Sequence, residues 1–164
     1  MKNIVLIGMP GAGKSTIGVL LAKSMLYSFV DTDLIIQNKH GKSLCDIIDS
    51  VGTDGFLEIE NDVICGCEFE HSVIATGGSA VYGAQAMSHL KENGTIVYLE
   101  LGLSEIERRL GDIHTRGVAM KNGTTVAELY EERKSIYEKY ADITLNCSGL
   151  TAEQCVDKII EMIK

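Results

Sequence analysis

Residues 8–15 have the types and spacing needed to hold phosphate groups. They read Gly-Met-Pro-Gly-Ala-Gly-Lys-Ser, which fills every fixed position of the GxxxxGK[ST] phosphate-binding loop. The glycines allow successive backbone N–H groups to converge on phosphate oxygens, and the N-terminus of a following helix adds partial positive charge. In such a loop Lys14 bridges the β- and γ-phosphates, and the Ser15 hydroxyl ligates Mg²⁺. A functionless glycine-rich turn is the alternative, and the complete motif argues against it.

Two carboxylates, Asp31 and Asp33, follow the next apolar run in the sequence Val-Asp-Thr-Asp. At the carboxyl end of a strand, both would reach the crevice where α/β proteins bind ligands. One can orient Mg²⁺ through water, and the other can accept a proton from an attacking hydroxyl. The alternative is that both merely cap the next helix. Their place after a phosphate-binding loop favours chemistry.

All four arginines lie in one short stretch of an otherwise acidic chain: Arg108, Arg109, Arg116 and Arg133. Guanidinium groups gathered in this way can face a bound anion. Ordinary helix surface charge explains the clustering equally well. From the arginines alone, both interpretations stay open.

These residues must be positioned by strands that alternate with helices. Strands are expected at 4–7, 28–30, 72–75, 95–99 and 143–145. Helices are expected at 14–26, 33–40, 44–51, 54–69, 83–92, 104–110, 125–140 and 152–163. The last helix carries an apolar stripe at i, i+3, i+4 and i+7 behind a Thr151 cap. Apolar strands that alternate with helices predict an α/β fold with a parallel sheet covered on both faces.

The segment 111–123 does not fit this alternation. It is polar, has glycines at both ends and is centred on Arg116. Long loops inside compact domains are often lids that close over a ligand. We therefore expect a mobile lid here, within one domain that spans residues 1–164.

Composition narrows the classes of partner. The net charge of −8 argues against nucleic acid, but a nucleotide needs only a local positive pocket. No apolar run approaches the roughly 20 residues needed to cross a bilayer, and residues 4–7 are too short for a signal peptide. The five cysteines have no zinc-type spacing, which is typical of free thiols in a reducing compartment: Cys45, Cys65, Cys67, Cys147 and Cys155. We expect a cytoplasmic monomer.

The class of phosphate-binding protein can also be narrowed. A guanine-reading NKxD box is missing, since the only Asn-Lys pair, Asn38-Lys39, is followed by His-Gly. With 164 residues the chain has no room for the extra domain of a mechanical ATPase. Kinases of nucleotides and small molecules remain.

With these motifs in place, the chain resembles the shikimate kinases nearly from end to end. The shared features are the phosphate loop, the Asp-Thr-Asp, a Phe-x-x-x-Glu helix, a Gly-Gly turn, a lid arginine and a late Arg-x-x-x-Tyr helix. The resemblance implies a nucleoside-monophosphate-kinase-like fold of three layers with a five-stranded parallel sheet. It also implies transfer of the γ-phosphoryl group of ATP to the 3-hydroxyl of shikimate, in the pathway to the aromatic amino acids.

The resemblance assigns roles residue by residue. ATP would be held by Gly11, Ala12, Gly13, Lys14, Ser15 and Thr16, with Arg109 near the adenine and Arg116 as the lid arginine. Mg²⁺ would be held by Ser15 with help from Asp31. The acceptor would be bound by Asp33, Gly77, Gly78 and Arg133. Catalysis would rest on Lys14, Asp33 as the base, and Arg116.

Three departures from the family pattern fall mostly on the acceptor side. The family's Phe-Arg-x-x-Glu has Leu57 in place of the arginine that pairs with the shikimate carboxylate. The third glycine of its triple-glycine turn is Ser79, and the lid's Arg-Pro-Leu-Leu is Arg-Gly-Val-Ala from Arg116 onward. Two alternatives therefore stay open: a kinase of another small hydroxylated metabolite, and a nucleotide sensor that turns ATP over weakly or not at all.

Overall fold

The structure is a computed structural model that describes residues 2–111 and 117–164. Its strands are β1 (Asn3–Ile7), β2 (Ser28–Asp31), β3 (Ser72–Ala75), β4 (Gly94–Glu100) and β5 (Ile143–Asn146). Its helices are α1 (Lys14–Met25), α2 (Thr32–His40), α3 (Leu44–Cys65), the short 3₁₀ helix η1 (Ala80–Tyr82), α4 (Ala84–Glu92), α5 (Leu103–Leu110), α6 (Val126–Tyr140) and α7 (Ala152–Ile163). All five expected strands are present, each within one residue of its predicted ends.

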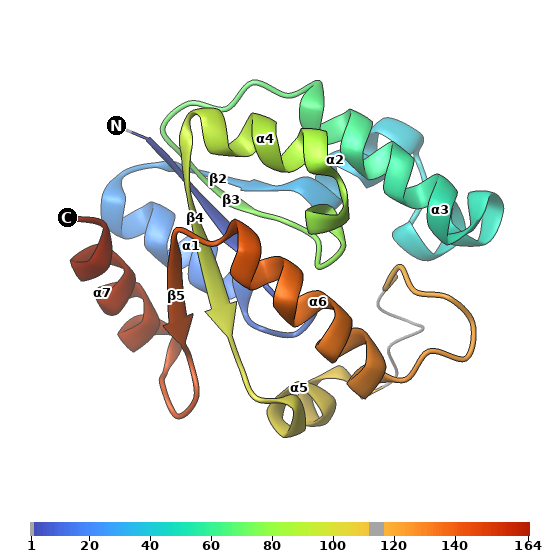
Figure 1. The fold of residues 1–164 in the computed structure, drawn as a ribbon. Coiled ribbons are helices and arrows are strands. Elements are labelled where there is room, and N and C mark those ends of the chain that lie inside the picture. The colour runs from blue at the N-terminus through green and yellow to red at the C-terminus, as the bar shows by residue number, and fades with distance from the viewer. Residues whose placement is uncertain (1, 112–116) are drawn as a thin grey trace.

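The strands form one parallel sheet in the order β2-β3-β1-β4-β5. Figure 1 shows helices on both faces of this sheet, where α1 packs with α7 and α3 packs with α4. Every residue of β1 and β3 is buried, as expected for strands covered on both sides. The α/β prediction with a parallel sheet is therefore confirmed.

The hydrophobic core lies in two clusters. The main cluster fills the space between the sheet and its helices. A smaller cluster joins α2 and the two halves of α3 to Ala119, and contains Ile36, Ile47 and Phe56. This second cluster supports the wall of the molecule that lies beside the Asp-Thr-Asp sequence.

Helix boundaries follow local signals except in α3. The predicted cap of the last helix is confirmed, since the Thr151 hydroxyl accepts from the Gln154 N–H and Gln154 reaches back in a capping box. The two helices predicted at 44–51 and 54–69 are confirmed as the two halves of α3, Leu44–Cys65, which meet at a non-helical kink at Gly52 (φ 76°, ψ 174°). The prediction also placed the end of this helix too late, because the chain turns at Gly66 toward β3.

Two further expectations concern the whole chain. None of the five cysteines forms a disulfide bond in the described parts of the chain. None of the helices in the described parts of the chain is long and apolar enough to cross a membrane.

Candidate active site

The carboxyl ends of the strands open onto a pocket of about 620 Å³. Its walls come from the phosphate loop, the end of β2 and start of α2, helix α3, the turn 77–79 after β3, helix α5, the segment 117–119 and helix α6. Most of the predicted site residues line it together: Gly11, Gly13, Lys14, Ser15, Thr16, Asp31, Asp33, Gly77, Gly78, Arg109 and Arg133. Residues that are far apart in the sequence thus meet in one cavity at the switch point of the sheet.

The phosphate loop has the backbone that its glycines predict. Gly8, Gly11 and Gly13 all have positive φ, and a Cβ on Gly8 would lie 2.8 Å from the Leu99 carbonyl oxygen. Only glycine fits this close approach between the loop and β4. The loop leads into the N-terminus of α1, a place where backbone N–H groups can face a bound anion. One of the predicted ATP-binding residues differs, because the Ala12 N–H donates to the Met9 carbonyl oxygen within the loop (3.1 Å).

Lys14 lies buried in this loop. Its Nζ donates to the carbonyl oxygens of Gly8 (2.7 Å) and Met9 (2.8 Å). Burial lowers the pKa of Lys14 to about 8, an effect that Asp33 partly opposes. The ammonium group is held by loop carbonyls and lines the pocket, where phosphate oxygens would supply further partners.

Asp31 combines the two roles that the sequence left open. Its Oδ1 accepts from the N–H groups of Asp33 (2.9 Å) and Leu34 (3.3 Å), which caps α2. Its Oδ2 accepts from the Ser15 hydroxyl at 3.3 Å. Capping and a place in the pocket are therefore compatible for this residue.

The oxygens of Ser15 and Asp31 fit the chemistry of a magnesium site. Mg²⁺ binds oxygen ligands, keeps several waters and needs only one or two protein groups beside phosphates. Among the described residues no group of three or more His, Cys, Asp or Glu side chains could hold a metal, so an all-protein cage is not offered there. The donor set suits a metal shared with a nucleotide.

Asp33 lies deeper in the pocket. Burial, with the nearby charge of Asp31, raises the pKa of Asp33 from 3.8 to about 6, although Lys14 acts in the opposite direction. A carboxyl group with a pKa near the working pH is suited to general base catalysis. The geometry separates the two aspartates, since Asp31 is tied to Ser15 and the helix cap while Asp33 faces Gly77.

Side chains from three helices fix the turn 77–79. The Gly77 N–H donates to Thr32 Oγ1 (3.3 Å), the Tyr137 hydroxyl donates to the Gly78 carbonyl oxygen (2.7 Å), and the Ser79 hydroxyl donates to Glu60 (2.6 Å). Both Gly77 and Gly78 were expected to present N–H groups to a ligand. Because Gly77 already has a partner, Gly78 is the better candidate for that role.

Arg133 is the charged group of the acceptor side. The residue is 1% exposed, Nη2 donates to the Ala119 carbonyl oxygen (2.6 Å), and the guanidinium lies 5.4 Å from the centre of the Tyr82 ring. Its Nε has no hydrogen-bond partner among the described residues. A buried guanidinium with an unused donor at a pocket wall is suited to hold a carboxylate.

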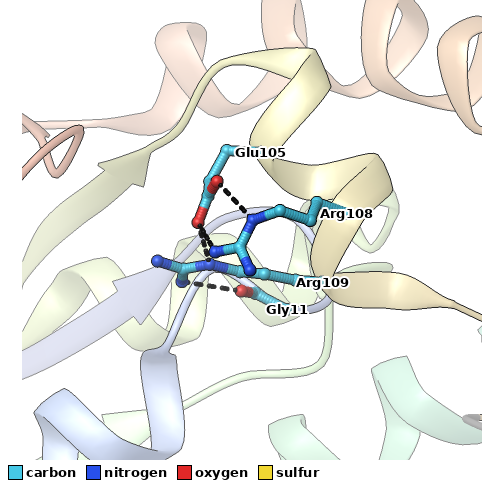
Figure 2. Close-up of polar contacts among 4 residues, drawn as sticks. All are labelled: Gly11, Glu105, Arg108 and Arg109. Atoms are coloured by element: carbon cyan, nitrogen blue, oxygen red, sulfur yellow. Dashed lines mark hydrogen bonds and ion pairs between the residues drawn. The ribbon is translucent and has the colours of Figure 1, made fainter.

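The other arginines differ in their positions. Arg109 Nη1 donates to the Gly11 carbonyl oxygen (3.1 Å), so α5 is joined to the phosphate loop, as Figure 2 shows. Arg108 is exposed and pairs with Glu105, which also accepts from Arg109. Arg116 and the rest of 112–116 lie outside the described residues. The clustering thus reflects a mixture of pocket and surface roles.

The structure also reveals residues that sequence reasoning did not assign. Leu57 packs against the second core cluster and is not among the described residues that line the pocket, whereas its neighbour Phe56 is. Glu60 and Tyr137 hold the turn 77–79 from behind. Their positions in the Phe-x-x-x-Glu and Arg-x-x-x-Tyr patterns were the only signals that could have found them.

The buried acid Glu60 predicts a pH dependence of stability. Burial raises the pKa of Glu60 from 4.5 to about 7, with the Ser79 hydrogen bond acting in the opposite direction. The folded chain therefore binds more protons than the unfolded chain, so the stabilisation is fully present below pH 4.5 and is lost as the pH rises through about 7. Between pH 5.5 and 8, wild type should lose about 1–2 kcal/mol of unfolding free energy relative to Glu60→Gln.

Urea unfolding of both proteins at the two pH values measures this difference. The exposed Glu58→Gln on the same helix is the matched control, and it should follow wild type. Asp33 titrates in all three proteins, so its contribution to the pH dependence cancels when their unfolding free energies are compared. Parallel pH profiles for wild type and Glu60→Gln would show that Glu60 is ionised in the folded chain across this range.

Comparisons with known proteins agree with this geometry. The family model for shikimate kinase matches residues 10–164. A shikimate kinase of Sulfurihydrogenibium sp. is 35% identical over all of this chain and 99% of its own length, and one of Francisella tularensis subsp. novicida is 38% identical over 96% and 92%. The structure of a shikimate kinase from Acinetobacter baumannii in complex with shikimate has a TM-score of 0.90 at 28% identity, covering 99% of this chain and 93% of that one. The chain belongs to the shikimate kinase family.

Proposed function

We propose that this chain is a shikimate kinase, which transfers the γ-phosphoryl group of ATP to the 3-hydroxyl of shikimate. One observation carries the proposal most directly. A phosphate loop, a carboxylate with a pKa near 6 and a buried arginine line the same pocket. Phosphoryl transfer to an alcohol needs a cradle for the nucleotide, a proton acceptor and a site that orients the acceptor, and the pocket offers one group for each.

The proposed reaction follows from these groups. The acceptor hydroxyl oxygen forms a bond to the γ-phosphorus as the bond from the γ-phosphorus to the β,γ-bridging oxygen breaks, and ADP leaves. The hydroxyl proton passes to Asp33. Lys14 and the loop N–H groups bind the phosphate oxygens and stabilise their charge. Arg133 and the Gly78 N–H hold the acceptor so that its hydroxyl faces the phosphate.

The proposed metal site uses Ser15, with Asp31 acting through water. When bound, Mg²⁺ would neutralise charge on the phosphates. Arg116 is assigned to the lid, and Arg109 to the adenine side, by the family pattern. The enzyme is proposed to work as a monomer in the cytoplasm, where cysteines without disulfide bonds suit a reducing environment.

A coupled assay of ADP release tests the function. ATP and Mg²⁺ are supplied with shikimate, quinate, sugars or nucleoside monophosphates, each in turn. ADP release that depends on shikimate, together with phosphorylated shikimate in the product, is the expected result. Turnover with another alcohol alone would make the chain a kinase of a different metabolite. ATP binding without turnover of any acceptor would identify a nucleotide sensor.

The departure at Leu57 predicts weak binding of the shikimate carboxylate. Of the two arginines in the family pattern, only Arg133 is present. A charge-assisted hydrogen bond contributes roughly 1.5–3 kcal/mol, so Leu57→Arg should lower the KM for shikimate by about 10- to 150-fold. Shikimate titrations of both proteins measure the effect.

Leu57→Met is the matched control, because it changes packing in the second core cluster without adding charge. It should leave the KM near that of wild type. A low-micromolar KM for shikimate in wild type would contradict the argument that the carboxylate site is weakened.

A further inference from the structure

Glu60 on α3 is a buried acid that the proposed reaction does not use. The residue is 2% exposed. Its Oε1 accepts the 2.6 Å hydrogen bond from Ser79, whereas its Oε2 has no hydrogen-bond partner among the described residues. A buried carboxyl oxygen without a hydrogen-bond partner lowers the stability of the fold, so we expect a function that explains its presence.

The Glu60 carboxyl group lies directly behind the acceptor wall of the pocket. A Cβ built on Gly77 would be 2.8 Å from Glu60 Oε2 and 2.6 Å from Asp33 Oδ1. Both carboxyl groups therefore contact the same face of Gly77, one from α3 and one from α2. Any residue larger than glycine at position 77 would push the turn away from Asp33, the proposed base.

Among the three side chains that anchor the turn 77–79, Glu60 has a distinct property. The Thr32 hydroxyl does not ionise, and burial raises the pKa of Tyr137 well above its usual range. Glu60, in contrast, changes its charge near neutral pH because burial raises its pKa to about 7. A carboxylate accepts a stronger hydrogen bond than a carboxylic acid does, so this anchor can vary in strength.

One departure from the family pattern, Ser79, contacts this carboxyl group, and another, Leu57, lies on the same helix as Glu60. Leu57 precedes Glu60 by three residues on α3, a spacing that makes side chains neighbours on a helix. The family's arginine would stand there, but leucine offers no positive charge. Ser79 replaces the third glycine of the turn, and its hydroxyl donates the hydrogen bond that Glu60 accepts. The serine gives the carboxyl group a donor from outside its own helix.

The charged groups around Glu60 come from several elements. Asp33 of α2 raises the pKa of Glu60, whereas Arg133 of α6 and Lys14 of α1 lower it. Tyr137 of α6 faces it as a neutral phenol. Glu60 therefore lies among the phosphate-binding, acceptor-binding and base residues and contacts the pocket through Ser79.

We propose that Glu60 is a positioning residue for the acceptor, which it serves by holding the turn 77–79 through the Ser79 hydroxyl. The proposal rests on the proposed function, in which Gly78 of this turn binds the acceptor. It predicts that loss of the Ser79 hydroxyl harms acceptor binding selectively.

Kinetics of Ser79→Ala, Glu60→Met and the double variant test the proposal. Ser79→Ala should raise the acceptor KM by about 5- to 10-fold, as expected for loss of one hydrogen bond, with the ATP KM close to wild type. In the Glu60→Met background, Ser79→Ala should change the acceptor KM by less than about twofold, because its partner is already absent. Ser135→Ala, which removes an exposed hydroxyl on α6, is the matched control.

A second measurement does not depend on turnover or on the folding of Glu60→Met. In ¹³C NMR titrations, the Glu60 carboxyl signal of Ser79→Ala should titrate at a higher pH than in wild type, because the serine hydrogen bond lowers the pKa of Glu60. If wild type phosphorylates no shikimate, the proposed function fails. The midpoint of the Glu60 carboxyl titration still decides whether Ser79 acts on Glu60.

Three results would overturn the inference. The first is an acceptor KM of Ser79→Ala within about twofold of wild type. The second is an equal rise in the KM values for ATP and acceptor, which would mean that the bond supports the whole pocket. The third is an unchanged midpoint for the Glu60 carboxyl group.

Discussion

Replacing Lys14 with alanine is expected to lower turnover by about three orders of magnitude or more, with little change in the fold. Among the described residues its ammonium group donates only to loop carbonyls, and it lines the pocket, so the core does not depend on it. Phosphoryl transfer depends on positioning and charge neutralisation, and alanine supplies neither. Steady-state ADP release measures the loss, and circular dichroism checks the fold.

Lys23→Ala is the matched control for this experiment. Lys23 lies on the same helix but is exposed at its last turn. Its replacement should leave turnover near that of wild type. If Lys14→Ala kept more than about a tenth of wild-type turnover, the loop 8–15 would not be the catalytic phosphate site.

Asp33→Asn is expected to lower kcat by roughly 10²- to 10⁴-fold, because asparagine keeps the shape of the side chain but cannot accept the proton. The wild-type rate should also fall as the pH drops through about 6, where Asp33 becomes protonated. Initial rates from pH 5 to pH 9 measure both effects.

The variant Asp31→Asn distinguishes the role of Asp31 from that of Asp33. Asp31 accepts from Ser15 and caps α2, so its loss should mainly raise the Mg²⁺ concentration needed for half-maximal rate. Magnesium titrations of both variants provide the comparison. Indistinguishable metal dependence in Asp31→Asn and Asp33→Asn would contradict the proposed division of roles.

Much of the fold could be predicted because its signals are local. Buried parallel strands such as β1 and β3 are short apolar runs, and the cap at Thr151 is predicted from a few neighbouring residues. The end of α3 was predicted too late, although Gly66 directly after Cys65 is a residue type that often ends helices. Tertiary packing decides where that helix gives way to the loop before β3.

The site could be predicted only in part for a related reason. The phosphate loop is contiguous, so its backbone and its partner strand follow from the motif. The acceptor wall is assembled from Glu60, Ser79 and Tyr137, which come from three separate elements. Nothing local in the sequence states that Ser79 faces Glu60, or that Leu57 turns toward the second core cluster. Those contacts depend on how α3 packs beside the sheet.

The central place of β1 has a consequence for biosynthesis. Val5 pairs with Ile74 on β3 and with Ile96 on β4, so β1 leaves the ribosome before either of the strands that it pairs with (Figure 1). At roughly 5–20 residues per second, translation leaves this apolar strand unpaired for several seconds. The phosphate loop after β1 also lacks its packing partner during this time, because Gly8 packs against the Leu99 carbonyl of β4. A nascent chain that ends before β4 therefore carries the entire phosphate-binding motif but cannot yet form the phosphate site.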